Sequence, residues 1–191
     1  MLVREAAIVA IDFETTGVVP GFPEEPWQIG LAFVQAGCLA PAYRFASSLR
    51  IESGRPFNAY VPGRHASLRD ELAAAPSLPE LWPQLIPWLQ GRPLLAHNAA
   101  VEKKMLAQAF PLHSFGPWID TLVLARQAFP KARSHKLEDL LETLHLTARV
   151  EAICPGMQPH DALYDAAGAA ILLEYLLSLP RWHDLALGHL L

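Results

Sequence analysis

Residues 6–17, AAIVAIDFETTG, constrain the fold more than any other stretch of this chain. The apolar run at its start is typical of a central strand that is buried on both faces, and Thr16–Gly17 ends it in a turn. Asp12 and Glu14 stand two residues apart, so their side chains emerge on the same face of the strand. Burying two like charges together costs free energy unless a cation lies between them. A divalent metal site is one interpretation, and a pair of acidic residues that merely opens a loop is the other.

Two predicted helices each place a further carboxylate on an apolar face. In the segment 99–110, Glu102 lies on the stripe that helical spacing predicts to face inward. Asp165 has the same relation to the inward stripe of the segment 159–177. A simpler explanation for Glu102 is a favourable interaction with the dipole at the helix start. His160 stands five residues before Asp165, where its side chain can reach the pocket that Asp165 enters.

Four carboxylates that enter apolar surroundings need a shared compensation. Asp12, Glu14, Glu102 and Asp165 offer the hard oxygen ligands that Mg²⁺ and Mn²⁺ prefer, and a two-metal site stabilises the attacking and leaving oxygens of phosphoryl displacement. A histidine beside them, His160, would take the proton from the attacking water near neutral pH. No group of His and Cys residues has the spacing of zinc ligands. The sequence also contains no serine triad and no phosphate-binding glycine loop.

The rest of the pattern predicts strands that alternate with helices. Asn98 is expected to cap the helix that follows it, and Asp161 to cap the helix that contains Asp165. Gly168 and the two alanines after it should let that helix lie close to the sheet. The predicted strands after the first are 28–35, 42–51, 93–96 and 118–121, and the predicted helices are 68–74, 79–91, 99–110, a segment from 122, 137–144 and 159–177.

The length of 191 residues predicts a single domain, 1–191. The chain has no uninterrupted apolar run of about 18 residues and no signal pattern at its start, which favours a cytoplasmic protein with no membrane partner. Cys38 and Cys154 fit no motif and are expected to be free, buried packing residues. The net charge of −4 gives no overall attraction to nucleic acid. One stretch, 126–136, nevertheless carries four Arg or Lys residues and no acidic residue.

Three segments resemble, in order, the motifs of the DEDDh, DnaQ-like 3′→5′ exonuclease superfamily. They are DFETTG at 12–17, AHNAAVE at 96–102 and HDALYDA at 160–166. The connecting segments IDT at 119–121 and SHKL at 134–137 are also similar. The resemblance covers nearly the whole chain. It implies a ribonuclease-H-like α/β fold, with a five-stranded mixed sheet in the order 3-2-1-4-5, strand 2 antiparallel, and helices on both faces.

The resemblance also implies roles for individual residues. Asp12, Glu14 and Asp165 would ligate two divalent cations, with Asp12 bridging them, and His160 would be the general base. The family has aspartate where this chain has Glu102, so this longer side chain could bind metal directly, bind through water or require a shifted helix; we expect a working metal ligand. Main-chain groups of residues 14–16 would meet the terminal 3′-hydroxyl. The expected substrate-binding residues are Phe13, Thr15, Thr16, Gly17, His97 and Asn98.

The implied activity is the release of nucleoside 5′-monophosphates, one at a time, from a single-stranded or frayed 3′ end. The first motif is closer to proofreading and DNA-processing members, which favours DNA over RNA. The basic stretch 126–136 could track phosphates, or it could be a solvated loop. Any proofreading role would require a noncovalent polymerase or repair partner. The alternatives are a catalytically weakened member that binds nucleic acid or a polymerase, and a phosphodiesterase that acts on dinucleotides or oligoribonucleotides.

Overall fold

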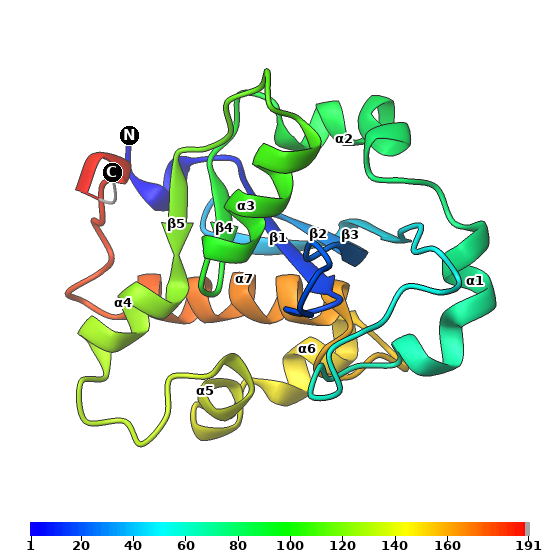
Figure 1. Cartoon of the computed structure of the whole chain (residues 1–191). Helices are drawn as coiled ribbons and strands as arrows, with labels where there is room; N and C mark the ends of the chain where they lie inside the picture. The colour runs from blue at the N-terminus through cyan, green and yellow to red at the C-terminus, as the bar shows by residue number, and fades with distance from the viewer. Residues whose placement is uncertain (190–191) are drawn as a thin grey trace.

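A five-stranded sheet with the strand order β3-β2-β1-β4-β5 forms the centre of the computed structural model, which describes residues 1–189 (Figure 1). The strand β2 runs antiparallel to β1 and to β3, whereas β4 runs parallel to β1 and to β5. The strands are β1 (Ile8–Thr15), β2 (Pro26–Gln35), β3 (Cys38–Ser48), β4 (Leu94–Ala96) and β5 (Trp118–Asp120). The ribonuclease-H-like sheet implied by the motifs is confirmed. The end of the predicted domain, residues 190–191, lies outside the described residues.

Helices cover both faces of the sheet (Figure 1). They are α1 (Arg69–Ala74), α2 (Trp82–Leu89), α3 (Ala100–Ala109), α4 (Thr121–Ala128), α5 (Leu137–Thr143), α6 (Thr147–Ile153) and α7 (Ala162–Ser178). Short 3₁₀ turns occur at Val3–Glu5, His65–Leu68, Pro79–Leu81 and Leu187–His189. The pattern did not predict α6, because this seven-residue helix buries only Val150 and so shows no apolar stripe. Across residues 1–189, no helix has both the length and the apolar character that a membrane crossing requires.

Alternate residues of β1 enter two different apolar cores. One core lies between the sheet and the helices α2 and α3, and the other lies between the sheet and α4 to α7. Val9, Ile11 and Phe13 belong to the first core, and Ile8 and Ala10 to the second. Because successive strand residues point to opposite faces, Asp12 and Glu14 continue the row that faces α7. The same alternation that fills both cores therefore sets both acidic side chains on one side.

The helix α7 approaches β2 very closely at Gly30, which pairs with Asp12 across the ladder. A Cβ atom at Gly30 would lie 2.2 Å from the Leu163 nitrogen and 2.4 Å from the Ala162 oxygen. Only glycine leaves room for the first turn of α7 at this place. The sequence prediction assigned this role to Gly168, and it was wrong, because Gly168 faces Leu side chains of α5 instead.

The strand β3 begins earlier than predicted, and its first residue is not buried. Ala36 and Gly37 both have positive φ angles, 53° and 75°, as in a tight hairpin turn, so pairing with β2 resumes at once with Cys38. Pro41 is tolerated because β3 is an edge strand. Cys38 is exposed and Cys154 is buried. The prediction of two buried packing cysteines is therefore wrong for Cys38.

Candidate active site

The end of β1 carries two carboxylates past the point where its neighbour β4 stops. The ladder between β1 and β4 includes only Val9 and Ala10, so Asp12 and Glu14 lie beyond it. Glu14 is buried, and the Oδ2 atom of Asp12 is buried without a hydrogen-bond partner among the described residues. An orphaned carboxylate oxygen is costly unless a cation or another partner compensates it. This part of the strand therefore has the character of a ligand set.

The third carboxylate, Glu102, is placed by the start of α3. Its side chain is 3% exposed, and its buried Oε2 atom has no hydrogen-bond partner among residues 1–189. The carboxylate of Asp120, at the end of β5, accepts hydrogen bonds from the backbone nitrogens of Asn98 (3.0 Å) and Ala99 (3.1 Å). It also accepts one from Leu122 at the start of α4. Asp120 thus holds the beginnings of two helices and, through α3, the position of Glu102.

The expected cap at Asn98 is absent from this arrangement. Asn98 has a left-handed backbone, with φ of 71°, and the residue that begins α3 as its N-cap is Ala99. Instead, the carboxylate of Asp120, 21 residues along the chain, accepts the backbone N–H of this N-cap residue. The prediction failed because a cap from a distant strand leaves no local sequence signal.

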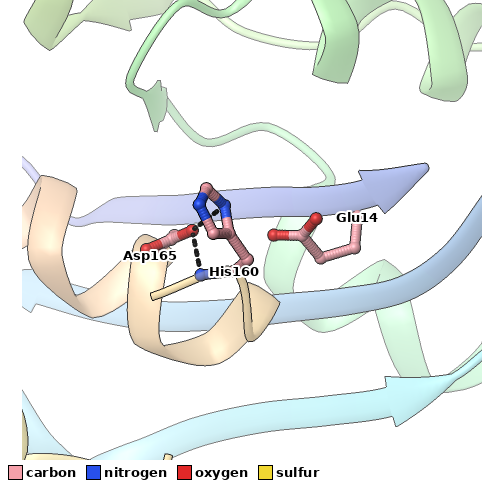
Figure 2. A group of neighbouring side chains, drawn as sticks. All are labelled: Glu14, His160 and Asp165. Carbon is pink, nitrogen blue, oxygen red and sulfur yellow. Dashed lines mark hydrogen bonds and ion pairs between the residues drawn. The ribbon is translucent and has the colours of Figure 1, made fainter. Parts of the chain in front are cut away.

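The fourth carboxylate, Asp165, lies in the first turn of α7 beside His160. Its Oδ2 atom accepts a hydrogen bond from the His160 backbone nitrogen at 3.0 Å and lies 3.9 Å from the ring atom Nδ1. The other ring nitrogen, Nε2, is 3.7 Å from Oε2 of Glu138 on α5. Figure 2 shows Glu14, His160 and Asp165 gathered beside β1, and each offers one atom within 4.8 Å of the others. Glu14 from β1 and Asp165 from α7 can therefore share one metal ion, with the ring of His160 beside it.

Burial and mutual repulsion raise the pKa of every carboxyl group in this cluster. The pKa of Glu14 is raised to about 8, first by burial and then by the charge of Asp165. Burial also raises the pKa of Glu102 to about 7, against the effect of nearby backbone N–H groups, and that of Asp165 to about 7. For Asp12, burial and the three other carboxylates raise the pKa well above its ordinary value. The hard oxygen donors and the two orphaned oxygens fit Mg²⁺ or Mn²⁺.

We expect the metal-free protein to lose stability as the pH rises from about 4.5 to about 8. The folded-state pKa values of Glu14, Glu102 and Asp165 exceed those of the unfolded chain, so the folded protein binds more protons in this range. The stabilisation present below the unfolded pKa is lost as the pH passes through 7 to 8. Thermal unfolding in EDTA and in MgCl₂ across this range measures the effect, and Mg²⁺ should reverse it. A midpoint that rises with pH in EDTA would contradict the expectation.

A cavity of about 770 Å³ connects the carboxylates with the basic stretch. Asp12, Asp165 and His160 are among the residues that line it. The lining also includes Arg126, Arg133, Lys136, Glu138, Tyr60 and Pro62. Tyr60 is 94% exposed. The sequence reasoning missed Tyr60 and Glu138, since Tyr60 stands in a segment without periodicity and Glu138 looks like an ordinary charged residue at a helix start.

The turn after β1, at Thr16 and Gly17, is held in place by contacts with neighbouring segments. Thr16 is fully buried, and its Oγ1 atom accepts hydrogen bonds from the Glu25 backbone (3.1 Å) and from the buried Arg55 (3.3 Å). Gly17 has φ of 66°, and a Cβ there would come within 2.5 Å of Val61. Phe13 is 5% exposed and packs in the core on the opposite face of β1. The side chains of Phe13 and Thr16 are thus both buried, so the expected contacts of these two residues with a substrate would involve their main-chain groups.

Two of the other predicted substrate-binding residues, His97 and Asn98, line the cavity. Thr15 is half-buried at the end of β1, and its hydroxyl donates a hydrogen bond to Glu24. The ring nitrogens of His97 contact Thr121 Oγ1 at 2.9 Å and the carbonyl oxygen of His135 at 2.8 Å. His97 therefore ties the end of β4 to the basic stretch. In this arrangement neither ring nitrogen is left for a substrate.

Comparisons with known proteins agree with this geometry. The family model RNase_T, described as "Exonuclease", matches residues 9–173. A curated relative, the DNA polymerase III PolC-type of Bacillus cereus, is 27% identical over 180 residues, which are 92% of this chain and 12% of that protein. The chain thus spans about an eighth of that relative's length.

Two solved structures share the fold over nearly their whole length. A structure described as Exonuclease X in complex with 5′ overhanging duplex DNA is 25% identical, with a TM-score of 0.67, and the match covers 94% of this chain and 97% of that one. The nuclease domain of 3′hExo, described as a DEDDh family member bound to rAMP, is 21% identical, with a TM-score of 0.70, covering 93% and 94%. Because the family model matches residues 9–173, which are most of this chain, the chain belongs to the exonuclease family of the DEDDh, DnaQ-like superfamily.

Proposed function

We propose that this chain is a metal-dependent 3′→5′ exonuclease that releases nucleoside 5′-monophosphates from single-stranded or frayed 3′ ends. The observation that carries the proposal is the convergence of four carboxylates from β1, α3 and α7, two of which have a buried oxygen with no hydrogen-bond partner among residues 1–189. A histidine stands beside them in a cavity that basic residues also line. Phosphodiester hydrolysis needs these three parts: cation ligands, a base and a binding surface for a charged chain.

In this proposal, Asp12, Glu14, Glu102 and Asp165 are the residues that would hold two divalent cations, Mg²⁺ or Mn²⁺. When bound, the cations would supply electrostatic stabilisation of the charge that develops on the attacking and leaving oxygens. The protein contributes a fixed strand for two of the ligands and two helix starts for the others. Because the ligands come from three separate elements, correct docking of the helices is a condition for activity.

His160 acts as the general base on the water that attacks the terminal phosphodiester. Its ring is partly exposed to the cavity, so it can accept a proton from a bound water and pass it to solvent. Glu138, at 3.7 Å from Nε2, and Asp165, at 3.9 Å from Nδ1, lie on either side of the ring.

The basic and aromatic residues that line the cavity provide the surface for the nucleic acid strand. Arg126, Arg133 and Lys136 would contact backbone phosphates, and the exposed ring of Tyr60 would stack on a base. Contacts of both kinds tolerate any sequence, as exonucleolytic degradation requires. The names of two relatives, a DNA polymerase and an exonuclease bound to duplex DNA, favour DNA over RNA. The polymerase relative also supports a polymerase or repair partner for this chain.

A single assay tests this function. Single-stranded DNA, RNA and a dinucleotide, each labelled at its 5′ end, are incubated with Mg²⁺ or Mn²⁺ and either the wild-type protein or the Asp12→Ala variant. We expect a ladder that shortens from the 3′ end with the wild-type protein only, together with nucleoside 5′-monophosphates. Binding without shortening would instead indicate a catalytically weakened nucleic-acid-binding protein, and cleavage of the dinucleotide alone a small-substrate phosphodiesterase.

The variant Glu102→Asp tests whether the longer side chain is a fitted ligand. Replacing it withdraws the carboxylate by about 1.5 Å, the length of one carbon–carbon bond, while α3 stays fixed by Asp120. We expect turnover to fall by about 100-fold, because a misplacement of this size is costly in an active site. Turnover measured against Mg²⁺ concentration should also show weaker Mg²⁺ binding in Glu102→Gln. Higher activity in Glu102→Asp, or a metal-soaked structure with Glu102 turned away from the ions, would refute the assignment.

A further inference from the structure

An ion pair with one fully buried partner joins the loop that carries His160 to the segment between β3 and α1. Asp161 is 1% exposed, and its Oδ1 atom accepts hydrogen bonds from Arg64 Nε at 3.0 Å and Nη2 at 2.7 Å. Its Oδ2 atom accepts a third from the Gln158 backbone nitrogen at 3.0 Å. The sequence predicted that Asp161 caps α7, and this prediction is wrong. The residue stands at the N-cap position, but its carboxylate makes no capping hydrogen bond to the helix.

This contact is strong for a physical reason. A buried carboxylate that loses its cationic partner keeps the full cost of its lost hydration, so removal of Arg64 leaves an uncompensated charge at Asp161. The guanidinium donates twice to the same oxygen, which fixes the direction as well as the distance of the contact. The segments that contain Arg64 and Asp161 are 97 residues apart in the sequence, and the pair holds them together.

His160 directly precedes Asp161 and depends on its neighbours for its conformation. It has φ of 69°, which is unfavourable for a residue with a side chain, so contacts on either side must hold it. On one side, Asp165 accepts its backbone N–H. On the other, Gly63 lies so close that a Cβ there would be 3.1 Å from the His160 carbonyl oxygen. Residues 63 and 64 together support the loop that carries His160, residues 156–162, which we call the histidine loop.

The same segment also forms part of the cavity wall. Tyr60 and Pro62 line the cavity with His160, and Arg64 follows two residues later. The Arg64–Asp161 pair therefore connects the part of the cavity wall that contains Tyr60 with the loop that carries His160.

We propose that Arg64 is a positioning residue for His160, which it acts on through Asp161. It holds the histidine loop in the conformation that directs the ring to the cavity, and it fixes that loop to the wall that carries Tyr60. The catalytic consequence rests on the exonuclease function proposed above, whereas the structural consequence does not.

Arg64→Gln and Arg64→Lys test the proposal, with Arg149→Gln as a matched control. Arg149 pairs with Glu174 at the same N–O distance, 2.7 Å, and its side chain is 48% exposed compared with 46% for Arg64, but this pair joins α6 to α7 and does not involve the loop that carries His160. We expect Arg64→Gln to lower kcat by about 10- to 100-fold, with a smaller rise in KM because the segment that carries Tyr60 also loosens. Arg64→Lys should recover part of the loss, because lysine restores the charge but not the two-point contact. Arg149→Gln should leave kcat unchanged.

The same substitution in a His160→Ala background separates positioning from general damage. If Arg64 acts through His160, Arg64→Gln has no further effect on kcat once the imidazole is gone. An equal loss in both backgrounds would overturn the proposal.

Amide hydrogen exchange gives a readout that does not depend on activity. We expect Arg64→Gln to speed exchange in residues 156–162 and 58–65 while the central strands keep their protection. Unchanged exchange in these two segments would overturn the proposal even in an active enzyme. If the wild-type protein shows no exonuclease activity, the proposed function fails, and the exchange result still decides whether Arg64 holds the loop.

Discussion

The variant Asp12→Asn is expected to reduce turnover by about 10³-fold or more and, at the same time, to stabilise the metal-free protein. Asp12 is the carboxylate whose pKa is raised by all three of its partners, so it stands at the centre of the cluster. Loss of its charge removes the ligand shared by both proposed cations. The same change relieves repulsion among buried like charges, which should raise the free energy of unfolding in EDTA by about 1–2 kcal/mol.

Two measurements on the same preparation check this pair of effects. Release of mononucleotides gives the turnover, and thermal unfolding in EDTA and in MgCl₂ gives the stability. Asp70→Asn is a suitable control, because Asp70 is an exposed carboxylate in the first turn of α1, away from the cavity. Near-normal turnover in Asp12→Asn would contradict the role of Asp12 as a ligand. A lower unfolding temperature in EDTA would show that the charge of Asp12 is not a main source of repulsion in the cluster.

The second large effect is expected for Gly30→Ala. The added methyl group would overlap with the backbone of Ala162 and Leu163 at 2.2–2.4 Å, and backbone atoms cannot rotate away as a flexible side chain can. The start of α7 must move or the strand must bend, which should cost about 3 kcal/mol of stability. Because α7 carries Asp165 and follows His160, turnover should fall by more than tenfold even where the protein stays folded.

Denaturant unfolding and turnover, compared with Gly54→Ala, test this expectation. Gly54 has open space around its Cβ position and no positive φ, so alanine there should change neither quantity by a measurable amount. A Gly30→Ala protein with an unchanged denaturation midpoint would mean that α7 can withdraw from β2 without loss. Normal turnover in the same protein would mean that the site does not depend on this close approach.

The sequence predicts the parts of the site that depend on local periodicity. The apolar run before Asp12 identifies a central strand, and helical spacing places Glu102 and Asp165 on inward faces, as the structure confirms. These predictions succeed because burial repeats every two residues in a strand and every 3.6 residues in a helix. The strand order follows from the family resemblance rather than from any pattern in the residues.

The parts that the sequence does not predict come from contacts between distant segments. Asp120 caps α3 from another strand, and Gly30 rather than Gly168 makes room for α7. Arg64 and Glu138 reach the neighbourhood of His160 from separate elements. None of these residues stands in a periodic pattern, so only the arrangement of the whole fold reveals which side chain each one meets.

The order of the elements along the chain has a consequence for synthesis. The helix α7 packs against β1, β2 and β3, all of which precede it, and it brings Asp165 while the loop before it brings His160. A ribosome that has completed only the first 158 residues has produced the whole sheet but neither of these two groups. Because α7 also supplies a large share of the buried core on its face of the sheet, the same helix closes that core and completes the cluster of carboxylates.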